Sequence, residues 1–154
     1  MTQVTIRTAA PEDAPRIHEI EEMCFQDPWS RDAIAFEMGE NPLALYVVAE
    51  ADGEFAGYAG LWQIGEEGHI TNVAVRPDLQ GKGIATQLVS GLIEEGENRG
   101  IEDFTLEVRR GNDAGRALYE KFGFQVEGVR KGYYQKEKED ALIMWRRGEN
   151  NDRR

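Results

Sequence analysis

Residues 73–85 read VAVRPDLQGKGIA, and this stretch decides the fold. A β-rich run at 69–76 leads into a turn with two glycines, and an amphipathic segment at 82–98 follows. The small residues leave successive backbone N–H groups unobstructed where the strand gives way to the helix. The first helical turn also offers unpartnered N–H donors and the positive end of the helix dipole. The stretch therefore predicts a strand, a turn and a helix start that can bind an anion such as a pyrophosphate.

The same turn has a plainer interpretation, because a short glycine-rich turn is more often only a tight connection. Two other phosphate-binding patterns are absent. No G-x-G-x-x-G follows the first strand of a repeating βαβ series, and no G-x-x-x-x-G-K-S/T occurs. Lys82 and Arg76 are nearby cations that could add to an anion site. The surroundings of the turn must decide between the two interpretations.

The rest of the chain shows alternating strand and helix patterns. Strands are predicted at 3–8, 44–50, 54–64, 69–76, 102–109, 124–133 and 139–146. One predicted helix follows a turn at 10–13 and carries Ile17, Ile20, Cys24 and Phe25 along one side. The others are a short helix that Ser30 caps and helices at 82–98 and 112–122.

The predicted order of elements is β-α-α-β-β-β-α-β-α-β-β. Asp52-Gly53 is a strong hairpin signal, so the flanking strands should pair antiparallel. The unit at 69–109 joins two strands through a helix and should be parallel and right-handed. The fold class is therefore mixed α/β, with a central, mostly antiparallel sheet, one parallel βαβ crossover and flanking helices.

The 154 residues suit one domain, which we place at 1–147, with a disordered tail at 148–154. No stretch has the pattern of an export signal or the length of a membrane span. Cys24 is the only cysteine, so neither an internal disulfide nor a cysteine-based metal site is available. We expect a soluble, cytoplasmic protein without a metal, and the oligomeric state stays open.

The formal net charge is −11, which argues against a broad nucleic-acid surface because such surfaces need clustered Lys and Arg. An acidic field raises the rate of encounter with a cationic peptide. Charge of this size also simply aids solubility, and the residues alone leave both interpretations open. We expect a basic protein partner, and neither nucleic acid nor membrane.

Residues 73–86 resemble the acyl-CoA signature Q/R-x-x-G-x-G/A of the GNAT superfamily of N-acetyltransferases, with Gln80, Gly83 and Ala85 in the defining places. The preceding VAVRPDLQ resembles the family strand that splays from its neighbour. Asn112 and the segment 117–124 (ALYEKFGF) resemble the second family signature. The resemblance implies acetyl-CoA as co-substrate. The residues it assigns to acetyl-CoA are Val73, Ala74, Val75, Gln80, Gly81, Lys82, Gly83, Ile84, Ala85, Thr86 and Asn112.

Within the superfamily, nearly the whole chain is similar to the RimI type, whose members acetylate the N-terminal alanine of a small-subunit ribosomal protein. The segments that carry this similarity are CFQDPWS (24–30), LEVR (106–109), RKGYY (130–134) and EDALIM (139–144). Gly115 departs from the pattern, and as a helix residue it costs up to about 1 kcal/mol. A broader N-terminal or small-amine acetyltransferase and a catalytically silent acyl-CoA-binding module are the alternatives.

The resemblance implies direct transfer in a ternary complex, with Glu107 as base and Tyr119 as acid. A carboxylate suffices to take a proton from an N-terminal ammonium, whose reference pKa is about 7.7 to 8.0. From the residues alone, Glu107 would be a strand glutamate paired with Arg109 or Arg116, and Tyr119 a core tyrosine. A backbone N–H around Val75 is the natural donor to the oxyanion, because a splayed strand leaves such groups unpaired.

The remaining candidates have simpler interpretations. Cys24 lies on an apolar helix face and is predicted to pack, which excludes a covalent acyl-enzyme. His18 and His69 lack metal-ligand spacing and are interpreted as structural or surface residues. For Trp29, Tyr133 and Tyr134 a place in the wall of a peptide groove and a place in the core are equally compatible with the sequence.

Overall fold

A computed structural model describes residues 3–134 and 139–148 of the protein. Seven strands form one sheet in the order β1-β2-β3-β4-β5-β7-β6. They span Val4–Thr8 (β1), Ala44–Ala51 (β2), Glu54–Ile64 (β3), Glu67–Val75 (β4), Asp103–Arg109 (β5), Gln125–Tyr134 (β6) and Glu139–Arg146 (β7). The α-helices span Ala14–Cys24 (α1), Arg31–Gly39 (α2), Ile84–Asn98 (α3) and Asp113–Glu120 (α4). The predicted order of elements is confirmed, and so is the fold class.

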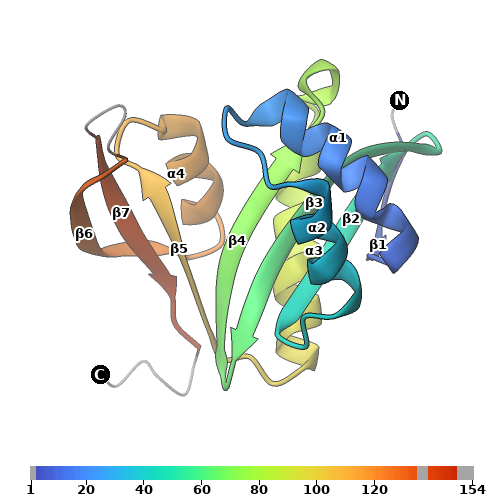
Figure 1. Ribbon diagram of the computed structural model, residues 1–154. Coiled ribbons are helices and arrows are strands. Elements are labelled where there is room, and N and C mark those ends of the chain that lie inside the picture. The colour runs from blue at the N-terminus through green and yellow to red at the C-terminus, as the bar shows by residue number, and fades with distance from the viewer. Residues whose placement is uncertain (1–2, 135–138, 149–154) are drawn as a thin grey trace.

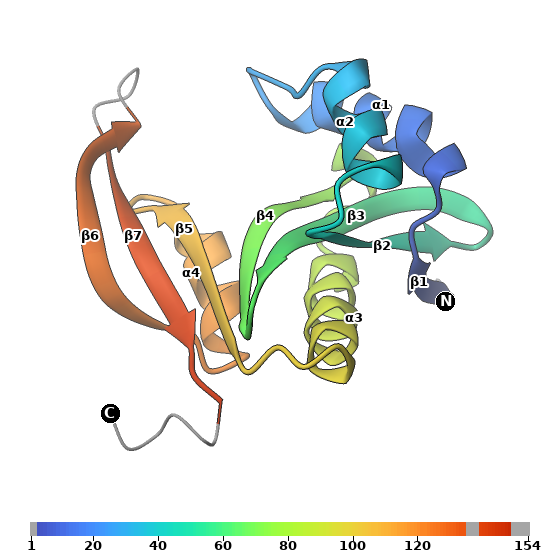
Figure 2. The same ribbon diagram turned by 60° about the horizontal axis from the view of Figure 1, so that its bottom comes forward.

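The helices cover both faces of the sheet (Figures 1 and 2). α1 and α2 pack on one face of β2–β4, where Ile17, Ile20 and Ile34 are almost fully buried. α3 packs on the opposite face through Leu88 and Leu92, and α4 lies on the same side as α3. The predicted apolar side of the 82–98 segment is therefore the side that contacts the sheet.

β4 and β5 form the one parallel pair among the described strands, and they diverge soon after they meet. Their register covers three pairs, Glu67↔Asp103, Gly68↔Phe104 and His69↔Thr105. Beyond this point β4 continues beside β3 alone and β5 beside β7 alone, within the described residues. Figure 2 shows the resulting gap between the two halves of the sheet, β1–β4 and β5–β7.

Local chemistry explains the ends of several elements. Ser30 caps α2 as predicted, since its Oγ accepts a hydrogen bond from the Ala33 N–H at 3.1 Å. The hairpin turn at Asp52-Gly53 has φ of 51° and 85°, the left-handed values that this dipeptide tolerates. α4 is shorter than the predicted 112–122, because Asn112 is its N-cap and the helix stops at Glu120. The predicted turn at 10–13 contains a 3-10 turn at Pro11–Asp13, and a second 3-10 turn at Pro77–Leu79 was not predicted.

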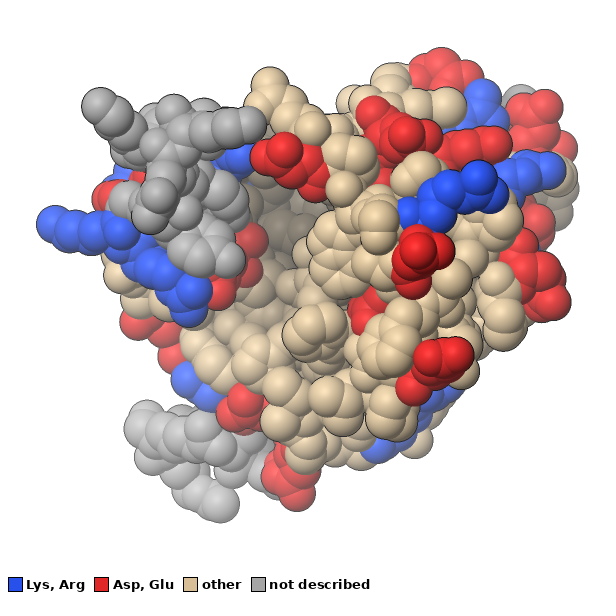
Figure 3. Space-filling view, in the orientation of Figure 1, with Lys and Arg blue, Asp and Glu red and all other residues tan. Residues whose placement is uncertain are grey.

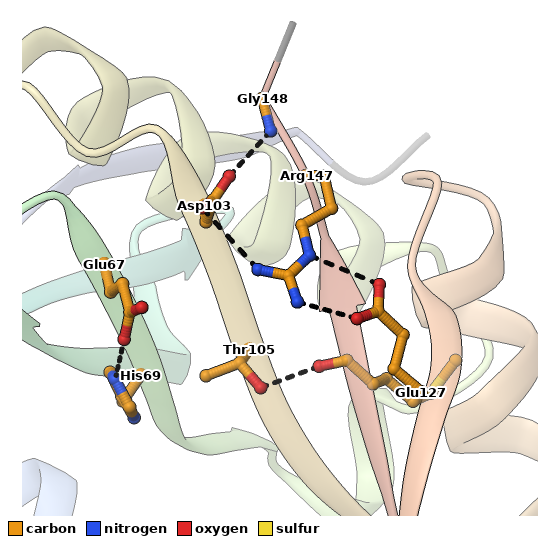
Figure 4. A network of polar contacts seen from close by, with 8 residues as sticks. Glu67, His69, Asp103, Thr105, Glu127, Arg147 and Gly148 are labelled. Carbon is orange, nitrogen blue, oxygen red and sulfur yellow. Dashed lines mark hydrogen bonds and ion pairs between the residues drawn. The ribbon is translucent and has the colours of Figure 1, made fainter. Parts of the chain in front are cut away.

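The end of β7 is tied to the rest of the sheet by a cluster of polar contacts (Figure 4). Arg147 contacts Glu127 at 2.7 Å and Asp103 at 3.7 Å, and its guanidinium lies 4.1 Å from the centroid of the Trp145 ring. The Gly148 N–H donates to Asp103 Oδ1 at 2.9 Å. Of the predicted tail, Gly148 is therefore held in place, and residues 149–154 lie outside the described residues. None of the described helices has the length and apolar character needed to cross a membrane.

Candidate active site

A cavity of about 350 Å³ lies where the diverging strand β4, the glycine turn, the start of α3 and the length of α4 come together. The end of α1 closes one side of it. Its lining residues are Cys24, Phe25, Val73, Ala74, Val75, Leu79, Gln80, Gly81, Ile84, Ala85, Asn112, Gly115, Leu118 and Tyr119. The face seen in Figure 3 is hollowed between the two halves of the sheet, and uncharged side chains cover most of the hollow.

The glycine turn has the backbone conformation that an anion site needs. Gly81 and Gly83 have φ of 82° and 80°, and a Cβ at either position would meet nothing within 4 Å. Gly83 is the N-cap of α3 and has no side chain to occupy the N–H groups of the first turn. The turn therefore leaves open space in front of backbone donors, and this geometry fits a diphosphate.

The peptide groups around Val75 face the opening between the strands. The Arg76 N–H donates to Ala56 O at 2.8 Å, toward β3. Because consecutive peptide groups along a strand point to opposite sides, the N–H and C=O of Val75 face away from β3. The Val75 carbonyl accepts hydrogen bonds from Cys24 Sγ at 3.3 Å and from Gln80 Nε2 at 3.2 Å. In this structure the Gln80 side chain therefore binds the backbone of β4.

Cys24 lies in the cavity wall, which the sequence did not predict. Burial raises the pKa of its thiol, and the carboxylate of Glu21 raises it further. A thiol with a raised pKa is protonated at neutral pH and is a poor nucleophile. This result supports direct transfer over an acyl-enzyme on Cys24.

α4 contributes Tyr119 and Asn112 to the cavity. The Tyr119 ring packs edge-to-face on Phe124, with centroids 5.7 Å apart. Asn112 Oδ1 accepts a hydrogen bond from the Gly115 N–H at 2.9 Å and so caps α4. A Cβ on Gly115 would lie 2.6 Å from Asn112 Nδ2. Gly115 has a low helix propensity, but its missing side chain leaves the space that the capping side chain of Asn112 occupies.

Four of the predicted site residues, Lys82, Gly83, Thr86 and Glu107, are not among those that line the cavity. Lys82 is exposed beside the turn. Glu107 lies on β5 with its side chain 30% exposed, and its Oε1 is 3.2 Å from an Arg130 guanidinium nitrogen. Arg130 comes from β6, so Glu107 pairs with a different arginine from Arg109 and Arg116, the two partners considered from the residues alone.

Arg76, which could have added positive charge to the turn, is engaged elsewhere. Its guanidinium contacts Asp78 at 2.8 Å and Glu54 at 3.8 Å. The site thus relies on backbone donors. The sequence also missed four lining residues, Phe25, Leu79, Gly115 and Leu118. Two of them adjoin predicted site residues, since Leu79 precedes Gln80 and Leu118 precedes Tyr119.

Comparison with known proteins agrees with this geometry. Residues 14–124 match the acetyltransferase (GNAT) family. A protein of Bacillus subtilis (strain 168), provisionally assigned as a ribosomal protein bS18-alanine N-acetyltransferase, is 40% identical over 144 residues, 94% of this chain and 95% of that protein. The ribosomal protein bS18-alanine N-acetyltransferase of Escherichia coli (strain K12) is 36% identical over 142 residues, 91% of this chain and 95% of that protein.

A solved structure extends the similarity to three dimensions. The crystal structure of the ribosomal-protein-S18-alanine N-acetyltransferase from Escherichia coli superposes with a TM-score of 0.84 at 35% identity. The superposition covers 96% of this chain and 98% of that chain. The similarity therefore includes both halves of the sheet and the opening between them.

Proposed function

The chain belongs to the acetyltransferase (GNAT) family, whose members use acetyl-CoA, and we propose that it acetylates the N-terminal alanine of ribosomal protein bS18. The observation that carries the proposal is the cavity that joins the glycine turn to Val75 and Tyr119. Two relatives that match over nearly their full length are assigned that substrate. Since this acceptor belongs to the ribosome, we place the activity in the cytoplasm.

The first part of the proposal concerns the acyl donor. Acetyl-CoA supplies an acetyl thioester, and the N–H groups of Ile84, Ala85 and Thr86 would hold its diphosphate at the N-terminus of α3. Val73 and Ala74 would hold the pantetheine arm along the free edge of β4. The Val75 N–H faces the opening and would donate to the acetyl oxygen as negative charge develops there.

Acetyl transfer removes two protons from the acceptor nitrogen. Glu107 takes the first, which leaves a neutral amine that forms a bond to the acetyl carbon. The nitrogen loses its second proton as the carbon–sulfur bond breaks, and a proton ends on the sulfur of the released CoA. Tyr119 donates a hydrogen bond to the departing thiolate. Full proton transfer from an unperturbed phenol to a thiolate is uphill by roughly 2 kcal/mol, so hydrogen bonding is the main contribution of Tyr119.

Kinetics of two variants test these roles. We expect Glu107→Gln to lower kcat/KM by about 100-fold or more and Tyr119→Phe to lower it by at least about 10-fold, since each removes one proton-transfer group. Binding of CoA, measured by calorimetry, should change little. Glu120→Gln, an exposed change on α4, is the control. If both site variants stay within about twofold of wild type at neutral pH, the assigned roles are wrong.

A panel of acceptors tests the substrate. Acetyl-CoA is mixed with peptides that begin Ala-Arg, Ser or Met-Glu and with free polyamines, and products are identified by mass spectrometry. The proposal expects strong preference for the alanine peptide taken from bS18. Equal turnover of all acceptors would indicate a broader acetyltransferase. Tight acetyl-CoA binding with no amine-dependent release of CoA would indicate a silent binding module.

A further inference from the structure

Two glutamates are buried under the helices that cover one face of the sheet. Glu21 on α1 is 2% exposed and Glu37 on α2 is 6% exposed. Each accepts a hydrogen bond from a tyrosine hydroxyl, Glu21 from Tyr58 and Glu37 from Tyr46, and the two rings stack with centroids 6.3 Å apart. The two carboxylates also line one small cavity. They therefore have closely matched surroundings.

Glu21 joins three separate segments of the chain. Its Oε2 accepts hydrogen bonds from the Tyr58 hydroxyl on β3 and from Asn72 Nδ2 on β4, the latter at 2.9 Å. Its Oε1 accepts the Trp29 N–H at 3.0 Å, in the segment that links α1 to α2. In each of these contacts the Glu21 carboxylate accepts a hydrogen bond and donates none. Its surroundings therefore offer it only donors.

Two of these segments, β4 and the link between α1 and α2, contribute residues to the wall of the candidate active site. Asn72 immediately precedes Val73–Val75, and it lies beyond His69, where β4 has already lost β5 as a neighbour. Cys24 is one helical turn after Glu21 on α1 and bonds to the Val75 carbonyl. The carboxylate therefore fixes the free part of β4 to the end of α1.

Glu37 holds a different part of the fold with bonds of the same kind. It accepts hydrogen bonds from Tyr46 at 3.0 Å, from Trp62 Nε1 at 2.6 Å and from Asn41 Nδ2 at 2.6 Å. None of these three partners adjoins a residue that lines the active-site cavity, whereas Asn72, a partner of Glu21, directly precedes Val73. Loss of either glutamate should destabilise the fold, and loss of Glu21 alone should disturb the site.

We propose that Glu21 is a positioning residue for acetyl transfer, and that it acts by holding Val73–Val75 and Cys24 in the geometry the acetyl group requires. The inference rests on the proposed function, because it assumes that acetyl transfer takes place at this wall. A misplacement of about 1 Å in a reacting group can cost 100-fold in rate. The Glu21 carboxylate holds the wall without contact with the reacting atoms.

The test compares Glu21→Gln with Glu37→Gln. Glutamine keeps the size of the side chain, but its single oxygen leaves at least one buried donor without an acceptor. We expect comparable losses of thermal stability in the two variants. We expect kcat to fall by about 10- to 100-fold in Glu21→Gln alone. The Kd for CoA should stay within about threefold of wild type, because the hydrogen bonds of Glu21 go to Trp29, Tyr58 and Asn72 and not to the glycine turn.

The outcomes separate this inference from the proposed function. A wild-type protein that acetylates no amine would contradict the function itself. An active wild type with equal kcat in Glu21→Gln and Glu37→Gln would overturn the positioning role. If Glu21→Gln cannot be purified folded, Tyr58→Phe and Tyr46→Phe are compared instead. Each of these milder variants removes one hydrogen bond to Glu21 or to Glu37. A fall in kcat confined to Tyr58→Phe supports the role, and equal kcat values overturn it.

Discussion

At the scale of single residues, the candidate site depends more on backbone conformation than on charged side chains. Arg76 is paired with Asp78, and Lys82 is exposed beside the turn, whereas Gly81 and Gly83 adopt left-handed conformations that few other residues tolerate. Glycine at these places leaves the N–H groups of the helix start accessible. Substitution of one glycine therefore tests the anion site more directly than removal of a cation.

Gly83→Ala should impair both stability and cofactor binding. The φ of 80° at this N-cap costs an alanine roughly 1–2 kcal/mol, although its Cβ would meet nothing within 4 Å. We expect the free energy of unfolding to fall by about 1 kcal/mol and the Kd for CoA to rise by about 10-fold as the turn relaxes. Urea titration and calorimetry measure the two quantities.

Gly39→Ala is the matched control for this prediction. A Cβ at Gly39 would likewise meet nothing within 4 Å, but this glycine ends α2 with a negative φ. Alanine there should stabilise the protein by about 0.5 kcal/mol and leave CoA binding unchanged. Equal effects of the two substitutions on CoA affinity would show that the conformation of Gly83 is irrelevant to binding.

At the scale of elements, α4 shows how a poor helix residue can be required by its neighbour. The Asn112 side chain caps the helix, and it occupies the space that a Cβ on Gly115 would need. Helix propensity favours Gly115→Ala by up to about 1 kcal/mol, whereas loss of the cap costs about 1 kcal/mol. The two residues should therefore be energetically coupled.

A double-mutant cycle at 112 and 115 measures that coupling. We expect Gly115→Ala to be neutral or destabilising in the wild type, and stabilising by up to about 1 kcal/mol in the Asn112→Ala background, where the obstacle is gone. Chemical unfolding of the four proteins gives the coupling energy. Simple additivity of the two changes would mean that the cap and the glycine do not interact.

The connection between β1 and α1 carries a pH-dependent contact. Arg7 donates to both oxygens of Asp13, at 2.8 and 2.9 Å, and the Ala10 N–H donates at 2.7 Å. The hydrogen bonds from Arg7 lower the pKa of Asp13 below its ordinary 3.8, against the effect of burial. A carboxyl with a lowered pKa stabilises the fold at pH values above its unfolded pKa, and this stability is lost as the pH falls through the folded pKa.

Asp13→Asn tests this contact. The variant should be less stable than wild type at neutral pH. The difference should narrow as the pH falls from 3.8, where Asp13 gains its proton in the unfolded chain, toward the lowered pKa of Asp13 in the folded protein. Urea unfolding between neutral pH and pH about 2.5 measures the difference. A constant difference over that range would mean that the carboxylate form of Asp13 adds no stability.

The sequence predicted the elements and the cavity-forming motifs because local patterns determine them. Asp52-Gly53 and the glycine turn act through their own backbone conformation, and Ser30 acts through a side-chain hydrogen bond to a residue three positions away.

Glu21 and Glu37 were missed because a glutamate normally indicates an exposed position. Glu21 lies four residues after Ile17 and three before Cys24, so helical spacing places it on the buried face, but the partners that satisfy it come from β3, β4 and a loop. The Glu107–Arg130 pair was missed for the same reason, since it joins β5 to β6.

At the scale of the whole molecule, the net charge of −11 has a kinetic consequence for a basic acceptor. An acidic field concentrates cations near the surface, and salt screens that field over about 8 to 10 Å. We expect KM for a lysine-rich alanine peptide to rise at least about threefold between about 20 and 200 mM NaCl. A neutral alanine peptide is the control. If KM changes equally for both peptides, the negative charge of the protein contributes to solubility and not to binding of the acceptor.

The three register pairs between β4 and β5 also form the shortest strand ladder among the described strands of the sheet. Residues 4–98 hold β1–β4 and α3, and residues 103–146 hold β5–β7 and α4, so each half is continuous in sequence. A ladder this short can open by local fluctuation while the hydrophobic core that spans both halves stays packed. Amide hydrogen exchange at Glu67–His69 and Asp103–Thr105 would then report how often this ladder opens, and a ligand that bridges the opening would slow that exchange.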